Sequence, residues 1–159
     1  MPNWIEGNLK VRGKYDDVKK YLCEGIQGYY FTKDFEGVPQ SKDKFMSVED
    51  TGDWIEVSFW GEPHITGTHR AFVEDCTVYL EPSDEDVVAV MPFRQAWSFK
   101  AGEFKKLSDE WNLDFRLQGW ERGMEFGEDI TIVRGEEPKC ELLDYDDWYW
   151  DCPMPFMGG

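Results

Sequence analysis

Polar and apolar residues alternate near the start of the chain. In NWIEGNLKVRG, residues 3–13, Ile5, Leu9 and Val11 alternate with charged and amide side chains, and Gly13 closes the run. A period of two is typical of a strand that buries one face. This segment therefore predicts a half-buried strand.

A helical spacing follows at once. In DDVKKYLCEGI, residues 16–26, Val18, Tyr21, Leu22 and Ile26 fall on one stripe, and two aspartates occupy the first turn, where a helix favours anions. The spacing predicts a helix. A helix that follows a strand so closely predicts a crossover to a parallel neighbouring strand.

Residues 28–66 are less regular. Within them Ile55, Val57 and Phe59 alternate with polar or aromatic neighbours, so we expect an inserted hairpin or pair of strands. Residues 70–81 then predict a strand that ends at the turn sequence PSDED. The strand after this turn, DVVAVMPF, is apolar at successive positions, so we expect it to be buried on both faces at the centre of a sheet.

The second half of the chain again contains both helical and strand-like spacing of apolar residues. Residues 100–111 have helical spacing, whereas residues 113–120 and 129–135 read as strands; no pattern continues after Gly135. The order strand, helix, two strands, helix, strand predicts an α+β fold of the ferredoxin-like split βαβ type, with an antiparallel sheet and both helices on one face. We expect one domain over residues 1–135 and a tail over residues 136–159.

Charge narrows the class of partner. The 159 residues are 41% hydrophobic and 16% aromatic, which favours a folded domain, and the formal net charge is -16. Such a surface repels DNA and RNA, because nucleic-acid affinity comes largely from Lys and Arg. We therefore expect no direct DNA binding, and we expect a protein partner with a basic surface.

Location and cysteine chemistry are inferred from absences in the sequence. The N-terminal segment lacks an apolar leader region, and the longest apolar run, Val87 to Phe93, is too short for a membrane span. We expect a cytoplasmic protein that does not enter membranes. Its four cysteines match no zinc spacing, so free thiols are expected, with a bridge between Cys140 and Cys152 as the alternative.

Two stretches resemble a known family. PNWIEGNLKVRG at the start, and PFRQAWSFKAGEFKKLSDEWNLDFRLQGWERGMEFGEDITIVRGE later, are similar to the Api92-like proteins of phages and plasmids. The resemblance covers residues 2–26 and roughly 86–136. It implies a ferredoxin-like domain and an origin in a mobile element that infects or inhabits a bacterial cell; it implies no catalytic residue. This chain has Ile5 where members often have Cys.

The tail contains the candidate partner-binding residues. It carries a net charge of -6, and aromatic residues are interleaved with its aspartates. Carboxylates at a surface can imitate phosphates, and Trp and Tyr dominate interface energetics. In the alternative interpretation, Trp148, Trp150 and Phe156 pack on the uncovered sheet face and the aspartates stay solvated. The predicted partner-binding residues are Asp144, Tyr145, Asp146, Asp147, Trp148, Tyr149, Trp150 and Asp151.

These observations favour a binding protein over an enzyme. No nucleophile elbow, phosphate-binding glycine loop or dinucleotide motif occurs in the sequence, and we expect no catalytic residue, cofactor or metal. The predicted function is binding of a host protein, for example as an anti-defence inhibitor such as an anti-CRISPR DNA mimic. Two alternatives remain: a metal-assisted hydrolase at His64, His69 and Cys76, and an RNA-binding module that uses the sheet face.

Overall fold

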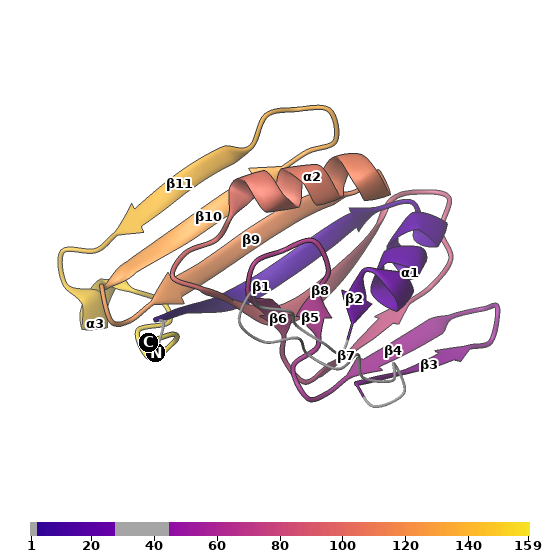
Figure 1. The fold of residues 1–159 in the computed structure, drawn as a ribbon, viewed down its shortest axis with the longest axis horizontal. Helices are drawn as coiled ribbons and strands as arrows, with labels where there is room; N and C mark the ends of the chain where they lie inside the picture. Colours follow the sequence, from indigo (N-terminus) through magenta and orange to yellow (C-terminus); the bar gives the residue numbers. More distant parts are fainter. Residues whose placement is uncertain (1–2, 28–44) are drawn as a thin grey trace.

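Two sheets and three helices make up the described part of the chain. The computed structural model describes residues 3–27 and 45–159, which form a mixed α+β fold with an open, mostly antiparallel sheet (Figure 1). The larger sheet has eight strands in the order β11-β10-β9-β1-β8-β6-β5-β2, and the smaller has the order β3-β4-β7. The elements are β1 (Trp4–Gly13), α1 (Tyr15–Glu24), β2 (Ile26–Gln27), β3 (Met46–Asp50), β4 (Ile55–Phe59), β5 (His64–Ile65), β6 (Ala71–Val73), β7 (Cys76–Leu80), β8 (Val87–Ala96), α2 (Ala101–Trp111), β9 (Asp114–Glu121), β10 (Phe126–Ile132), β11 (Lys139–Asp144) and α3 (Trp148–Asp151).

Strand β1 lies at the centre of the large sheet. It pairs antiparallel with β8 on one side and with β9 on the other. Its alternation confirms the sequence prediction, because Ile5, Leu9 and Val11 are fully buried whereas Asn8 and Arg12 are exposed. Since β8 and β9 both run antiparallel to β1, they are parallel to each other, and α2 connects them across it.

Helices α1 and α2 bury aromatic side chains in a common core. Tyr21 of α1 and Phe104 of α2 both pack edge-on against Phe115 of β9, with ring centroids 5.4 Å and 5.7 Å apart. All three side chains are almost fully buried. Edge-to-face contacts of this kind add to the free energy gained from burial. Because side chains alternate along a strand, the neighbour Arg116 points to the opposite, open face.

The prediction that the strand after α1 lies beside β1 is wrong, although that strand is parallel to β1. Strand β2, which follows α1, runs parallel to β1 by four successive antiparallel pairings, but it lies at the edge of the sheet. Three strands from later segments, β8, β6 and β5, lie between the two. The spacing of apolar residues in residues 1–26 cannot show that strands from later in the chain lie between β1 and β2.

The expectation for β8 is half correct. It is central, between β1 and β6. It is not buried on both faces, because Val88 and Val90 are 47% and 48% exposed. The reason is that side chains alternate along the strand: Met91 and Phe93 belong to the core, where Phe93 packs against Phe104 of α2, whereas Val88 and Val90 point to the opposite face.

The inserted region contains the expected hairpin. Strands β3 and β4 pair antiparallel, and β7 joins β4 on its other side. Residues 28–44 of the predicted insertion lie outside the described residues. The small sheet lies at one end of the molecule, beside α1 (Figure 1).

The predicted tail begins as part of the sheet. Strand β11 pairs with β10 from Lys139 to Asp144, at the edge opposite β2. Residues 139–144 show no alternation of apolar and polar side chains, because nearly every β11 side chain is exposed. All four cysteines are free, including Cys140 and Cys152. The ferredoxin-like assignment and the single-domain boundary at residue 135 stay predictions.

Candidate functional site

The C-terminal arm, residues 136–159, is held against the large sheet at several points. After β11, the Tyr145 hydroxyl accepts a hydrogen bond of 2.9 Å from Nε1 of Trp120 on β9. The Tyr145 ring then packs edge-on against Trp148, at 5.5 Å between centroids. Trp148 is 3% exposed, and its Nε1 donates to the Pro155 carbonyl at 2.9 Å. Trp148 is therefore the anchor of the arm.

The end of the arm is seated beside the start of β1. The backbone N–H of Gly159 donates to the Trp4 carbonyl at 3.0 Å, and that of Gly158 donates to the Glu6 carboxylate at 3.1 Å. Gly158 has φ 77, and a Cβ there would lie 2.5 Å from the backbone oxygens of Trp4 and Trp120. Only glycine fits this close approach without strain.

A reciprocal capping arrangement fixes the short helix α3. The Asp147 side chain accepts from the backbone N–H of Trp150 at 3.2 Å, and the Asp151 side chain accepts from the backbone N–H of Asp147 at 3.1 Å. This satisfies backbone donors at the helix start that would otherwise lack partners. Asp147 and Asp151, two of the predicted partner-binding residues, thus stabilise α3 in addition to contributing negative charge.

Three aromatic side chains of the arm face solvent. Trp150 is 86% exposed, Phe156 77% and Tyr149 63%. Tyr149 and Phe156 lie near each other, with ring centroids 6.1 Å apart. Large apolar side chains gathered at a surface mark interaction sites more often than chance exposure does.

The structure divides the eight predicted residues into two groups. Trp148 is buried, and Tyr145 is half-buried against it, so both support the arm rather than face outward. Tyr149 and Trp150 are exposed beside Asp144, Asp146, Asp147 and Asp151. Burial of Trp148 agrees with the packing interpretation; exposure of Trp150 and Phe156 does not. Phe156 also belongs to the exposed cluster, although it was not among the predicted partner-binding residues. The two prolines before it in CPMPF were the sequence signal that could have indicated its exposure.

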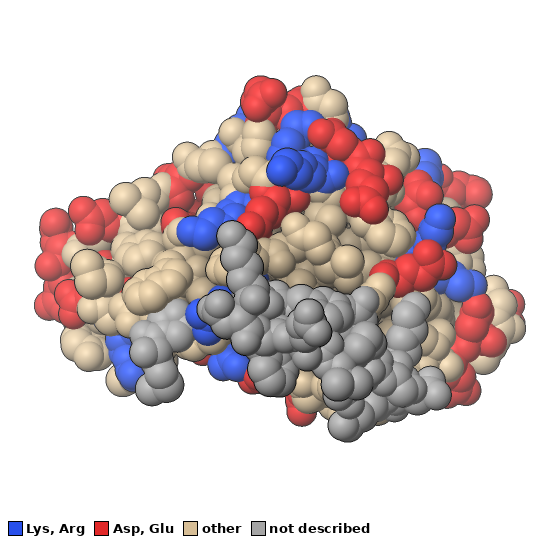
Figure 2. All heavy atoms as spheres, in the orientation of Figure 1, with Lys and Arg blue, Asp and Glu red and all other residues tan. Residues whose placement is uncertain are grey.

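Acidic side chains gather at several edges of the molecule. Figure 2 shows them at the left, upper and right edges of this view, and the left edge is the side where β11 and α3 lie in Figure 1. Within the described residues, the aspartates of the arm form no ion pair, and Lys139, the only cation of the arm, contacts Glu136 at 3.7 Å. The negative charge of the arm is therefore not neutralised locally.

A second site, not predicted from the sequence, is a hollow on the open face of the large sheet. It has a volume of about 220 Å³. Its lining comes from β1, β8, β9 and β10 and mixes three cations with one carboxylate and apolar groups. The lining residues are Lys10, Arg12, Val88, Asp114, Phe115, Arg116, Thr131 and Ile132.

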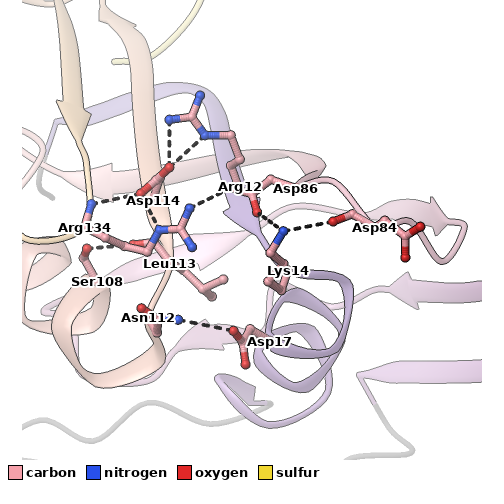
Figure 3. A network of polar contacts seen from close by, with 10 residues as sticks. All are labelled: Arg12, Lys14, Asp17, Asp84, Asp86, Ser108, Asn112, Leu113, Asp114 and Arg134. Atoms are coloured by element: carbon pink, nitrogen blue, oxygen red, sulfur yellow. Dashed lines mark hydrogen bonds and ion pairs between the residues drawn. The ribbon is translucent and has the colours of Figure 1, made fainter.

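Asp114 is the centre of a polar network beside this hollow (Figure 3). One carboxylate oxygen contacts Arg12 at 2.7 Å, and the other accepts from the backbone N–H and Nε of Arg134 at 2.9 Å and 3.0 Å. Arg134 also contacts Asp86 at 2.6 Å, and Lys14 contacts Asp86 at 3.5 Å. Burial alone would raise the pKa of Asp114, but the hydrogen bonds from Arg134 and Arg12 hold it below its usual value.

The network joins the two helices to the sheet. Lys14 precedes α1, and Asn112 at the end of α2 donates to Asp17 of α1 at 3.4 Å. Ser108 of α2 donates to the Leu113 carbonyl at 2.6 Å. Through Asp114, this network fixes Arg12, one of the three cations of the hollow.

The residues of the alternative hydrolase site lie on separate elements. His64 lies on β5 of the large sheet and Cys76 on β7 of the small one. Burial lowers the pKa of His64, which favours its neutral imidazole, and burial raises the pKa of the Cys76 thiol to about 11, which disfavours the nucleophilic thiolate at neutral pH. Across the two described ranges, no group of three or more His, Cys, Asp or Glu side chains could hold a metal ion.

Comparisons with protein-family models, with curated proteins and with solved structures give no match for this chain. Within residues 3–27 and 45–159, none of the helices has the length and apolar character needed to cross a membrane. The resemblance to the Api92-like family stays a prediction from the sequence.

Proposed function

We propose that the protein binds a partner protein through the C-terminal arm. The observation that carries the proposal is the 86% exposure of Trp150 on a helix that the buried Trp148 fixes in place. A large aromatic side chain on a rigid support loses little conformational entropy when a partner covers it. Such residues are the usual energetic centres of interfaces.

The charge of the arm specifies the class of partner. Asp144, Asp146, Asp147 and Asp151 surround the exposed rings and have no cationic partner in the described part of the chain. Carboxylates that face a basic surface raise the association rate and exclude acidic competitors. The proposed partner is therefore a host protein with a basic surface, of the kind that binds nucleic acid. Imitation of DNA, as an anti-defence or anti-CRISPR inhibitor would use it, is the most specific form of this proposal.

We also retain the ferredoxin-like assignment as a proposal. The crossover from β8 through α2 to β9, with β1 between the two parallel strands, supports a split βαβ unit. The family resemblance, and with it a phage or plasmid origin and a location in the cytoplasm of a bacterial host, rests on the sequence motifs alone.

The test is capture of the partner, its identification and measurement of its affinity. The immobilised chain is exposed to nuclease-treated bacterial lysate at low salt, bound proteins are identified by mass spectrometry, and the best candidate is purified. Trp150→Ala should weaken its binding by about 30-fold or more, the loss of a typical hot spot. The fourfold change of Asp144, Asp146, Asp147 and Asp151 to Asn should lower the association rate, while Asn at position 147 still caps α3.

A variant with the same change in charge elsewhere is the control. Glu49, Asp53, Asp84 and Glu85 are exposed and make no ion pair with a described residue, so their fourfold change to amides alters net charge equally. Its binding should stay close to that of the unchanged chain. Duplex DNA should compete with the protein for the captured partner. The proposal is wrong if the captured protein binds the Trp150 and arm variants with unchanged affinity and rate.

A further inference from the structure

The open face of the large sheet carries three cations close together. Lys10 of β1 lies directly opposite Arg116 of β9, and Arg12 lies two residues along β1 on the same face. Like charges at opposite positions of a sheet destabilise it. The chain has 33 acidic and 17 basic residues, so a group of three cations on one face is unusual for this composition. Carboxylates pair with Arg12 and Arg116, but Lys10 has no ion pair with a described residue to offset its repulsion from Arg116.

Neighbouring carboxylates hold two of these cations in fixed positions. Arg12 directs Nε and one terminal nitrogen at Asp114, at 2.8 Å and 2.7 Å. Arg116 directs Nε and one terminal nitrogen at Asp129, at 3.1 Å and 2.7 Å, and this contact lowers the pKa of Asp129. The second terminal nitrogen of each guanidinium has no partner among the described residues. An arginine fixed in this way has donors ready for a further anion.

Lys10 is the third donor of this cluster. Its ammonium group makes no hydrogen bond or ion pair with a residue in the described ranges, although Lys10 is near enough to Asp129 to lower the pKa of that carboxyl. Arg12 and Arg116 side chains are 51% and 46% exposed, so solvent reaches them. Three accessible cations thus surround one hollow.

The hollow itself is small and partly apolar. Val88 contributes an exposed apolar side chain and Thr131 adds a hydroxyl group, whereas Phe115 and Ile132 border the hollow with their side chains buried in the core. Its volume of about 220 Å³ is below the roughly 300–1,000 Å³ of sites that hold drug-sized ligands. A single anionic group with a short apolar body suits this space better than a nucleotide.

We propose that this hollow binds a small organic anion through a phosphate or carboxylate group. Lys10, Arg12 and Arg116 contact the anionic group, and Val88 contacts the apolar body. A small anion is favoured over a nucleic-acid strand because the net charge of -16 repels a polyanion along its whole length. A small ligand is affected mainly by charges within a Debye length, about 10 Å at 0.1 M salt, because repulsion from more distant carboxylates is screened. The three nearby cations therefore dominate its electrostatic attraction to the hollow.

Titration followed by NMR tests this site. The ¹⁵N-labelled chain is titrated separately with phenyl phosphate, benzoate and inorganic phosphate at constant ionic strength. Phenyl phosphate or benzoate should shift the amide signals of Lys10, Arg12, Arg116 and Thr131 in a saturable way. Lys10→Gln should raise the Kd about tenfold without altering the fold, because Lys10 has no partner among the described residues. Lys106→Gln, on the exposed side of α2, is the matched control and should bind normally.

Three outcomes would overturn the proposal. The first is the absence of saturable shifts at these residues with all three probes. The second is equal weakening by Lys106→Gln, which would indicate general attraction to surface charge. The third is tighter, salt-sensitive binding of a short single-stranded RNA at the same residues, which would make the open face an RNA site. Partner capture through the arm does not depend on any of these results.

Discussion

Asp114 shows how one residue can hold several elements together. It begins β9, and its carboxylate contacts Arg12 at the end of β1 and Arg134 after β10. Its side chain is 7% exposed, whereas that of Arg12 is 51% exposed. Loss of the carboxylate would leave the two guanidinium groups facing each other without the anion between them.

Asp114→Asn should lower the free energy of unfolding by about 2 kcal/mol, the typical worth of hydrogen bonds to a charged group. Urea unfolding followed by circular dichroism measures the change. Asp109→Asn is the control, because Asp109 pairs with Lys105 on the exposed side of α2 and its side chain is 58% exposed. That substitution should change stability by less than about 0.5 kcal/mol. Equal effects of the two substitutions would contradict the central role of Asp114.

The same carboxylate predicts a dependence of stability on pH. Its pKa in the folded protein is lowered, so the folded state favours the ionised form. The stabilisation is therefore present above the unfolded value of about 3.9 and is lost as pH falls through the lower folded value. Measured between pH 7 and pH 2, the difference in stability between the unchanged chain and Asp114→Asn should shrink below about pH 4. A difference that is constant over this range would be evidence against the assignment.

Gly119 permits a close contact inside the sheet. A Cβ at this position would lie 2.5 Å from the Phe99 ring and 2.7 Å from the Glu6 carbonyl. Gly119→Ala should therefore lower the free energy of unfolding by about 2 kcal/mol or more. Gly102→Ala in α2 is the matched control, because a Cβ there meets nothing within 4 Å. It should stabilise the protein by about 0.5–1 kcal/mol, and thermal unfolding of both variants would show opposite shifts in Tm.

At the scale of elements, the arm combines a buried anchor with an exposed surface. Trp148→Ala should detach α3 and cost about 3 kcal/mol, because a large buried ring and its hydrogen bond are lost. Trp150→Ala should leave stability within about 0.5 kcal/mol. Hydrogen exchange of the arm amides, measured by mass spectrometry, should rise in the first variant only. Unchanged exchange in Trp148→Ala would mean that other contacts hold the arm.

Periodicity predicted the elements that bury one face. Residues 3–13 and 16–26 gave β1 and α1 because their apolar side chains face a core at regular spacing. The same reasoning missed β11, whose side chains are exposed on both faces and so carry no alternation. It also missed the hollow, because Lys10 and Arg116 meet only through pairing of strands more than a hundred residues apart. The anchor role of Trp148, by contrast, was contained in the packing interpretation of the tail.

At the scale of the whole molecule, repulsion among the excess carboxylates lowers the stability of the folded state. The net charge is -16, and the ion pairs of the described residues are mostly solvent-exposed pairs that contribute up to about 1 kcal/mol each. Raising KCl from 10 to 150 mM shortens the Debye length from about 30 Å to about 8 Å. We expect Tm to rise by about 2–4 °C, as repulsion is screened more than attraction. A fall in Tm over the same range would mean that the ion pairs outweigh the repulsion.

The central place of β1 has a consequence for synthesis. Strand β1 leaves the ribosome before its partners β8 and β9, which end at residues 96 and 121. At about 5–20 residues per second, β1 waits roughly 4–17 seconds before β8 is complete. During that interval its apolar side chains have no sheet to join. The apolar side chains of β1 are therefore accessible to chaperones until β8 has emerged.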